Sequence, residues 1–141
     1  MKRSASARWT GSIKDGGGTL TTDSGVLDAT QYSFSTRFEA GVGSNPEELI
    51  AAAHAGCFSM ALSGFLGSAG HVPKTIETKA TVTIEKAELG FSIGGVHLDV
   101  TVDVQGMDES TFRETAAEAK DGCPVSRALS VPITMDARLA V

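Results

Sequence analysis

Two cysteines carry most of the chemistry that this sequence offers, because a thiolate serves as a nucleophile, a redox centre or a metal ligand. Cys57 and Cys123 are the only cysteines, and neither belongs to a Cys-x-x-Cys pair. Cys57 lies within a long apolar stretch, where burial raises a thiol pKa and activation needs a nearby cation. Cys123 precedes Pro124, a pattern typical of a helix start, where the helix dipole lowers a thiol pKa. Local physics therefore predicts that Cys123 is the more acidic thiol.

His54 precedes Cys57 by three residues, which is about one helical turn. This spacing allows a Cys-His pair for acyl transfer, so a Cys57-His54 hydrolase is one alternative. The pattern favours a core histidine instead, because no Asn or Asp at helical spacing would orient the ring. A zinc site of His54, Cys57 and Cys123 would lack an obvious fourth ligand, and the spacings match no standard zinc pattern. We therefore expect no metal.

An arginine and a glutamate form the next candidate pair. Glu47 and Glu48 fall in the first turn of an expected helix, and Glu48 has the capping-box spacing from Asn45. Glu47 is therefore free to hold an arginine. Arg37 lies between two phenylalanines on an expected strand over residues 34–40, where the simplest interpretation is a solvated charge at the strand edge.

The elements that position these residues alternate between strand and helix patterns. Their order, β-β-β-α-β-β-α-α-β, predicts an α+β fold with mostly antiparallel pairing, in a single domain over residues 1–141. The expected strands cover residues 5–12, 18–22, 34–40, 75–84, 90–104 and 131–139, and the expected helices follow the caps Asn45, Asp108 and Cys123.

The helix that begins after Asn45 is expected to reach about residue 68 or 70, and it is apolar on nearly every face. A helix of this kind is predicted to be surrounded by protein. A chain of this size has little else to cover it, so we expect a homodimer in which such helices pack together. A membrane span is disfavoured because the stretch is rich in Ala and Gly, carries a His, and lies between strand-like segments.

Composition narrows the class of partner. The 141 residues weigh 14.6 kDa and carry a net charge of −5 with a pI near 5.1, which disfavours nucleic acid and anionic membrane surfaces as partners. Aromatic residues make up 6 %, so few stacking platforms exist for single-stranded nucleic acid. The first residues lack the apolar region of a signal peptide, and two cysteines are too few for a disulfide scaffold. A reducing cytoplasmic location is expected.

Several stretches together resemble the OsmC/Ohr family of thiol peroxidases, and the arginine strand and cysteine helix resemble its osmotically inducible (OsmC) branch. The likeness covers essentially the whole chain. The stretches are TRFE at 36–39, NPEELIAAAHAGCFSMAL at 45–62 and GCPVS at 122–126, with TDSGVL at 22–27 earlier in the chain.

The resemblance implies an OsmC-like intertwined dimer with long apolar helices at its centre and antiparallel sheets outside. It also implies a peroxidase for organic hydroperoxides that uses H₂O₂ less well, in oxidative or osmotic stress defence. By position, Cys57 falls on the peroxidatic thiol and Cys123 on the resolving thiol. Arg37 and Glu47 fall on the residues that activate the peroxidatic thiol, and Glu47 is suited to fix the guanidinium through a bidentate pair.

The implied reaction oxidises Cys57 to a sulfenic acid, closes a Cys57–Cys123 disulfide and reduces it with an external dithiol or lipoyl-bearing protein. No metal or organic cofactor is needed. An apolar wall of Phe34, Phe58 and Met60 is expected to receive the hydroperoxide's tail. The competing interpretation is a non-enzymatic stress or binding protein in which the thiols are structural.

Overall fold

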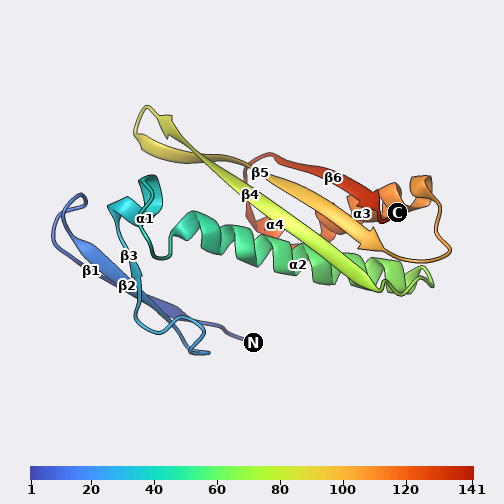
Figure 1. Cartoon of the computed structure of the whole chain (residues 1–141), viewed down its shortest axis with the longest axis horizontal. Helices are drawn as coiled ribbons and strands as arrows, with labels where there is room; N and C mark the ends of the chain where they lie inside the picture. Colours follow the sequence, from blue (N-terminus) through green and yellow to red (C-terminus); the bar gives the residue numbers. More distant parts are fainter. The chain divides into compact units, whose positions relative to one another are not determined.

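The computed structural model describes residues 1–141 and divides the chain into two compact units, Met1–Leu49 and Ile50–Val141. Six strands and four helices make an α+β fold (Figure 1), which confirms the predicted class, while the assignment of one domain over residues 1–141 stays a prediction. In chain order the elements are β1 (Ala5–Thr10), β2 (Gly17–Thr22), β3 (Thr30–Tyr32), α1 (Phe34–Phe38), α2 (Pro46–Ser68), β4 (Thr75–Ala87), β5 (Gly90–Asp103), α3 (Glu109–Gly122), α4 (Pro124–Ala128) and β6 (Ile133–Leu139).

The first unit is built on an antiparallel three-stranded sheet in the order β1-β2-β3. Gly18 on the middle strand lies opposite Trp9 on one side and Tyr32 on the other. A Cβ at Gly18 would lie 2.5 Å from the Tyr32 ring and 2.8 Å from the Trp9 ring. The glycine therefore makes room for the two rings to pack across the strand, with their centroids 5.4 Å apart.

The predicted strand over residues 34–40 is wrong, because Phe34–Phe38 forms the short helix α1. Ser33 starts it with a complete capping box: its hydroxyl accepts from the Thr36 N–H at 3.3 Å, and the Ser33 N–H donates to Thr36 Oγ1 at 2.8 Å. These local hydrogen bonds favour a helix more strongly than the weak alternation of apolar and polar residues favours a strand. The helix brings Phe34 and Phe38 onto one face, with ring centroids 4.9 Å apart.

Helix α2 begins at the predicted position. Asn45 Oδ1 accepts from the Glu48 N–H at 2.8 Å, and Pro46 occupies the first helical position, where a missing N–H has no cost. The Asn45 side chain also donates to the Thr36 carbonyl at 3.2 Å, so it ties α1 to the start of α2. The predicted N-cap and length of this helix are confirmed.

The second unit contains a sheet in the order β4-β5-β6, covered on one face by helices (Figure 1). β4 and β5 form an antiparallel hairpin, whereas β6 returns parallel to β5 after α3 and α4. Alternate residues of β5 point into the core, where they pack against α2 and α3. The fully or nearly fully buried hydrophobic residues are Phe58, Leu62, Leu66, Val96, Leu98, Val100, Val102, Phe112, Ala116, Ala119 and Cys123.

Only one face of α2 is covered within the chain. His54, Phe58, Leu62 and Leu66 recur every four residues and are fully buried, whereas Met60 is 79 % exposed. The predicted enclosure on all sides is therefore not provided by this chain alone. By length and apolar composition α2 would also suffice to cross a membrane, a criterion that core helices of soluble proteins meet as well.

We expect Phe112→Ala to lower the free energy of unfolding by about 3–5 kcal/mol, because it empties a fully enclosed site in the core. The matched control is Val72→Ala, at a loop position that is 82 % exposed, which should change stability by less than about 0.5 kcal/mol. Urea denaturation followed by circular dichroism measures both. Equal effects of the two substitutions would contradict this description of the core.

Candidate functional site

Arg37 and Glu47 form a bidentate ion pair inside the first unit. Arg37 Nε donates to Glu47 Oε1 at 3.0 Å and to Oε2 at 3.3 Å, and Nη2 donates to Oε1 at 2.8 Å. The Glu47 side chain is 10 % exposed and that of Arg37 is 38 % exposed. The buried carboxylate therefore fixes the guanidinium plane, while part of the arginine stays accessible. The pairing of these two residues agrees with the sequence-based expectation, although Arg37 lies on helix α1 rather than on a strand.

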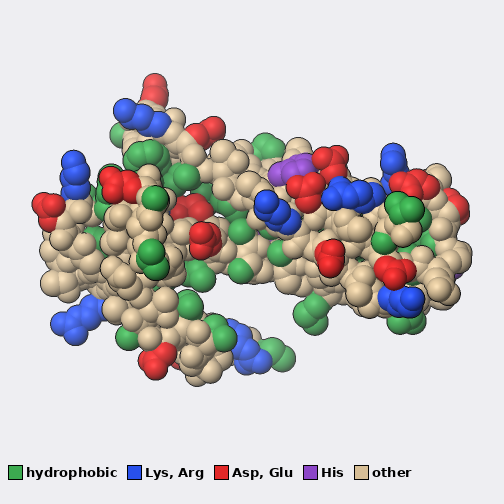
Figure 2. All heavy atoms as spheres, viewed as in Figure 1, with side chains coloured by type: hydrophobic (Ala, Val, Ile, Leu, Met, Phe, Trp, Pro, Cys, Tyr) green, Lys and Arg blue, Asp and Glu red, His purple; other side chains and the backbone are tan.

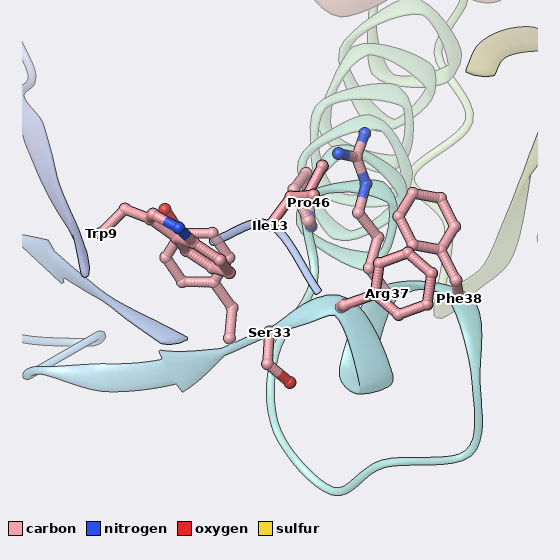
Figure 3. Close-up of a pocket in the computed structure, with 8 residues that line it drawn as sticks. Trp9, Ile13, Ser33, Arg37, Phe38 and Pro46 are labelled. Carbon is pink, nitrogen blue, oxygen red and sulfur yellow. The ribbon is translucent and has the colours of Figure 1, made fainter. Parts of the chain in front are cut away.

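A cavity of about 330 Å³ lies beside this arginine and belongs entirely to the first unit. Its walls are mainly aromatic, and the Arg37 guanidinium lies over the Phe38 ring, with Cζ 5.1 Å from the ring centroid. Figure 3 shows Trp9 on one side and Arg37 and Phe38 on the other. The lining residues are Trp9, Ile13, Tyr32, Ser33, Phe34, Arg37, Phe38 and Pro46.

The two cysteines lie side by side in the second unit, within hydrogen-bond contact of each other. Cys57 comes from the middle of α2 and is half-buried, whereas Cys123 lies at the junction of α3 and α4 and is fully buried. Both are free thiols. Tertiary packing thus joins two residues that are far apart in sequence, and this arrangement suits the formation of one disulfide within the chain.

The surroundings move the two thiol pKa values in opposite directions. Burial raises the pKa of Cys57 most, the Val125 N–H lowers it, and the neighbouring Cys123 sulfur raises it further. Burial also raises the pKa of Cys123, but the Ser126 N–H, the Cys57 thiol and the Ser126 hydroxyl together outweigh burial and lower it. The Cys123 side chain makes no conventional helix-capping bond, yet its sulfur receives these donors. These directions agree with the predicted order of acidity.

His54 does not pair with Cys57. Its ring is fully buried, and Nε2 lies 2.7 Å from Ser126 Oγ on α4. Nδ1 has no hydrogen-bond partner, and burial lowers the pKa of the ring. The Cys-His arrangement of a hydrolase is therefore not formed. Sequence reasoning did not single out Ser126, although its place three residues after the helix-starting Cys123 is a usable signal.

The three residues expected to bind an apolar tail lie in different environments. Phe34 lines the aromatic cavity. Phe58 is fully buried in the core of the second unit, so its ring packs inside the protein instead of facing a substrate, and this assignment needs correction. Met60 is largely exposed on α2, and its role stays a prediction. Trp9 and Tyr32 were missed because strand pairing, which the local sequence does not show, brings them to the cavity.

One group of side chains has atoms close enough together to hold a metal ion: His97, Asp99 and Asp136, on the outer face of the second sheet. His97 Nε2 lies 3.3 Å from Asp136 Oδ2, and its Nδ1 lies 2.7 Å from Thr134 Oγ1. Arg138 approaches Asp99 at 3.9 Å. Figure 2 shows a histidine among acidic and basic side chains over this sheet. We interpret the group as a network of surface ion pairs.

The family model described as "OsmC-like protein" matches residues 39–137. The chain belongs to the OsmC-like family. It is 51 % identical over 139 residues to "Peroxiredoxin OsmC" of Escherichia coli strain K12, covering 99 % of this chain and 97 % of that protein. It is 30 % identical over 112 residues to "Organic hydroperoxide resistance protein OhrB" of Bacillus subtilis strain 168, covering 79 % and 80 %.

Solved structures agree with this membership. The crystal structure of Bacillus subtilis OhrB superposes with a TM-score of 0.71 at 28 % identity, covering 97 % of this chain and 98 % of that one. An OsmC-like protein from Mycoplasma pneumoniae reaches a TM-score of 0.77 at 13 % identity, which shows the shared fold. The resemblance seen in the sequence is therefore confirmed, and the chain has the OsmC-like fold.

We expect Cys123→Ser to lower the pKa of Cys57, because it removes the neighbouring sulfur that raises it through a hydrogen bond and through charge. Ultraviolet thiolate absorbance against pH measures this in the reduced protein. Ser130→Ala, at an exposed position just beyond α4, is the control and should leave the titration unchanged. A Cys57 pKa that stays in place or rises in Cys123→Ser would contradict the coupling of the two thiols.

Proposed function

We propose that this chain reduces organic hydroperoxides to alcohols, with Cys57 as the peroxidatic thiol and Cys123 as the resolving thiol. The observation that carries the proposal is the contact of two free thiols in a member of the OsmC-like family. The chain's class is that of its peroxiredoxin relative, which it matches at 51 % identity over nearly its full length. Relatives named for organic hydroperoxide resistance support the substrate class.

Accessibility decides which thiol reacts first. Cys123 is the more acidic thiol but has no exposed surface, whereas Cys57 is only half-buried. A hydroperoxide therefore reaches Cys57, and the buried Cys123 sulfur lies beside the Cys57 sulfur. Acidity and exposure thus favour different cysteines, and each property suits one of the two steps of the reaction.

In the first step the Cys57 thiolate attacks the outer oxygen of the hydroperoxide. An S–O bond forms and the O–O bond breaks, so that Cys57 becomes a sulfenic acid and the departing alkoxide takes a proton to become an alcohol. Sulfur is oxidised by two electrons and the peroxide is reduced by two. No metal or organic cofactor takes part.

In the second step the Cys123 thiolate attacks the Cys57 sulfur. A Cys57–Cys123 disulfide forms and hydroxide leaves, taking a proton to become water. An external dithiol, either a small molecule or a lipoyl-bearing protein, then returns two electrons through thiol–disulfide exchange. The contact between the two sulfurs supports this step because little movement is needed.

Arg37 is proposed to supply the cation that activates Cys57, with Glu47 holding its guanidinium in place. The short bidentate bonds support this role, because a fixed guanidinium stabilises developing negative charge without having to reorganise. Cys57 needs such a cation, since its immediate surroundings raise its pKa. The peroxide oxygens would bind against the accessible part of Arg37.

The aromatic cavity beside Arg37 is proposed to hold the apolar part of the hydroperoxide. Phe34 and Trp9 line it, and a volume of about 330 Å³ falls within the range of small-molecule sites. H₂O₂ has no apolar part to fill this space, so an organic hydroperoxide is expected to react more efficiently. This supports an organic substrate over H₂O₂.

The active form is proposed to be a cytoplasmic homodimer in which the exposed face of α2 packs against a second copy. Met60 and Phe65 are exposed on this helix, and covering them would remove apolar surface from water. Such packing would supply the enclosure that the apolar composition of α2 predicts.

Treating the reduced protein with one equivalent of cumene hydroperoxide tests the proposed function. We expect both thiols to be lost, with a loss of two hydrogens of mass within one chain. In Cys123→Ser, a sulfenic acid on Cys57 should accumulate and be trapped by dimedone, whereas Cys57→Ser should lose turnover. Two unreacted thiols would instead support structural cysteines and a non-enzymatic role.

We expect Arg37→Lys to lower kcat/KM for cumene hydroperoxide by about a hundredfold, because lysine keeps the charge but loses the fork that pairs with Glu47. Steady-state turnover with dithiothreitol as reductant measures this. Arg113→Lys is the matched control, since Arg113 pairs only with Glu109 on the exposed face of α3. Equal activity of the two variants would remove Arg37 from the mechanism.

A further inference from the structure

His54 is the one buried side chain with a polar atom left unsatisfied. Burial lowers its pKa, so the ring is neutral at neutral pH and carries a single proton. Placing this proton on Nδ1 would bury an N–H with no acceptor, whereas placing it on Nε2 leaves only an unused lone pair. Because an orphaned donor is the rarer and more costly defect, the proton belongs on Nε2.

This tautomer sets the direction of the hydrogen bond to α4. With its proton on Nε2, His54 donates to Ser126 Oγ across 2.7 Å. The oxygen of Ser126 is then engaged as an acceptor, so its own hydrogen must be donated elsewhere. Cys123 is the acceptor within reach, because Ser126 stands three residues after Cys123 in the first turn of α4 and its hydroxyl acts on the Cys123 sulfur.

We propose that His54 and Ser126 form a hydrogen-bond relay that positions and stabilises Cys123 as the resolving thiolate. The relay runs from His54 Nε2 on α2 to Ser126 Oγ on α4 and then to Cys123 Sγ. Both are positioning residues, because each acts on the reaction through the Cys123 sulfur. The proposal rests on the proposed function in giving Cys123 the resolving role, but the relay itself is a property of the reduced protein.

The relay explains why a polar side chain interrupts an apolar stripe. His54 stands four residues before Phe58 and faces the same core, where a hydrophobic residue would pack without leaving a nitrogen unsatisfied. A histidine is useful there because its neutral Nε2–H donates inward. The negative charge that His54 stabilises is that of the Cys123 thiolate. This charge is lost when the thiolate displaces hydroxide from the Cys57 sulfenic acid and the disulfide forms.

The other groups near Cys123 do not replace the relay. Cys57 on α2 contributes its thiol hydrogen, and the Ser126 and Val125 N–H groups contribute from α4. Among the neighbouring charges, Asp121 and Arg127 are exposed, and Lys120 Nζ donates to the Ile133 carbonyl at 3.4 Å. Once Cys57 is oxidised its thiol hydrogen is gone, and the Ser126 hydroxyl is then the remaining side-chain donor to the resolving sulfur.

The test is a titration of Cys123 by ultraviolet thiolate absorbance in a Cys57→Ser background, where no peroxide chemistry is needed. We expect Ser126→Ala and His54→Met to raise the pKa of Cys123, because each breaks the relay at a different link. Ser126→Thr and His54→Gln should keep it near the value of the parent, since threonine retains the hydroxyl and glutamine places an N–H near the position of Nε2. Ser130→Ala is the matched control.

A kinetic measurement in the two-cysteine protein gives the second readout. Rapid mixing with cumene hydroperoxide and quenching resolves sulfenic acid formation from disulfide closure. We expect the ratio of the closure rate to the formation rate to fall about threefold to tenfold in Ser126→Ala, because less Cys123 is ionised while each thiolate becomes somewhat more nucleophilic. Ser126→Thr should restore the ratio.

The outcomes separate the relay from the proposed function. Folded Ser126→Ala and His54→Met variants whose Cys123 titrates as in the parent would overturn the relay, and so would Thr and Gln variants that raise the pKa as much as Ala and Met do. A protein that shows the titration shifts but leaves both thiols unreacted with hydroperoxide would keep the relay and refute the peroxidase.

Discussion

The packing of one stripe of helix α2 onto the sheet and α3 is the constraint on which the thiol chemistry depends. His54, Phe58, Leu62 and Leu66 recur every four residues, and their burial fixes the rotation of the helix about its axis. This rotation leaves Cys57, the neighbour of Phe58, at the margin of the core, where it is half-buried and touches Cys123. A helix rotated by one residue would break the contact between the sulfurs.

The two sulfurs share an environment that assigns them different properties. Both are penalised by burial, but the donors at the start of α4 act on Cys123, so that its pKa falls while that of Cys57 rises. Such close groups titrate as a pair. A buried thiolate is protected from bulky oxidants yet is placed to attack its neighbour. The difference between the two cysteines therefore follows from burial and hydrogen bonding, without any difference in residue type.

The first unit holds the guanidinium of Arg37 in a fixed position. The capping box of α1 orients Arg37, and the Asn45 cap places Glu47 in the first turn of α2. The two side chains then meet in a bidentate pair whose carboxylate is nearly buried. The geometry of this pair therefore decides where its guanidinium lies.

Much of this protein follows from the sequence alone. The starts of α2, α3 and α4 are encoded by Asn45 with Pro46, by Asp108 and by Pro124, since helix caps are decided by neighbours in the chain. The acidity of Cys123 was predictable for the same reason. Family motifs added the OsmC-like fold and the expected roles of the two cysteines.

Tertiary structure decided what local rules do not specify. Phe58 turned inward to the core, whereas the helix over residues 34–38 arose from a local capping box between Ser33 and Thr36 that the weak strand alternation concealed. The partnership of His54 with Ser126 and the aromatic cavity around Trp9 join residues from distant parts of the chain. Such contacts depend on which faces the packed elements present to one another, and a pattern of nearest neighbours in sequence does not carry that information.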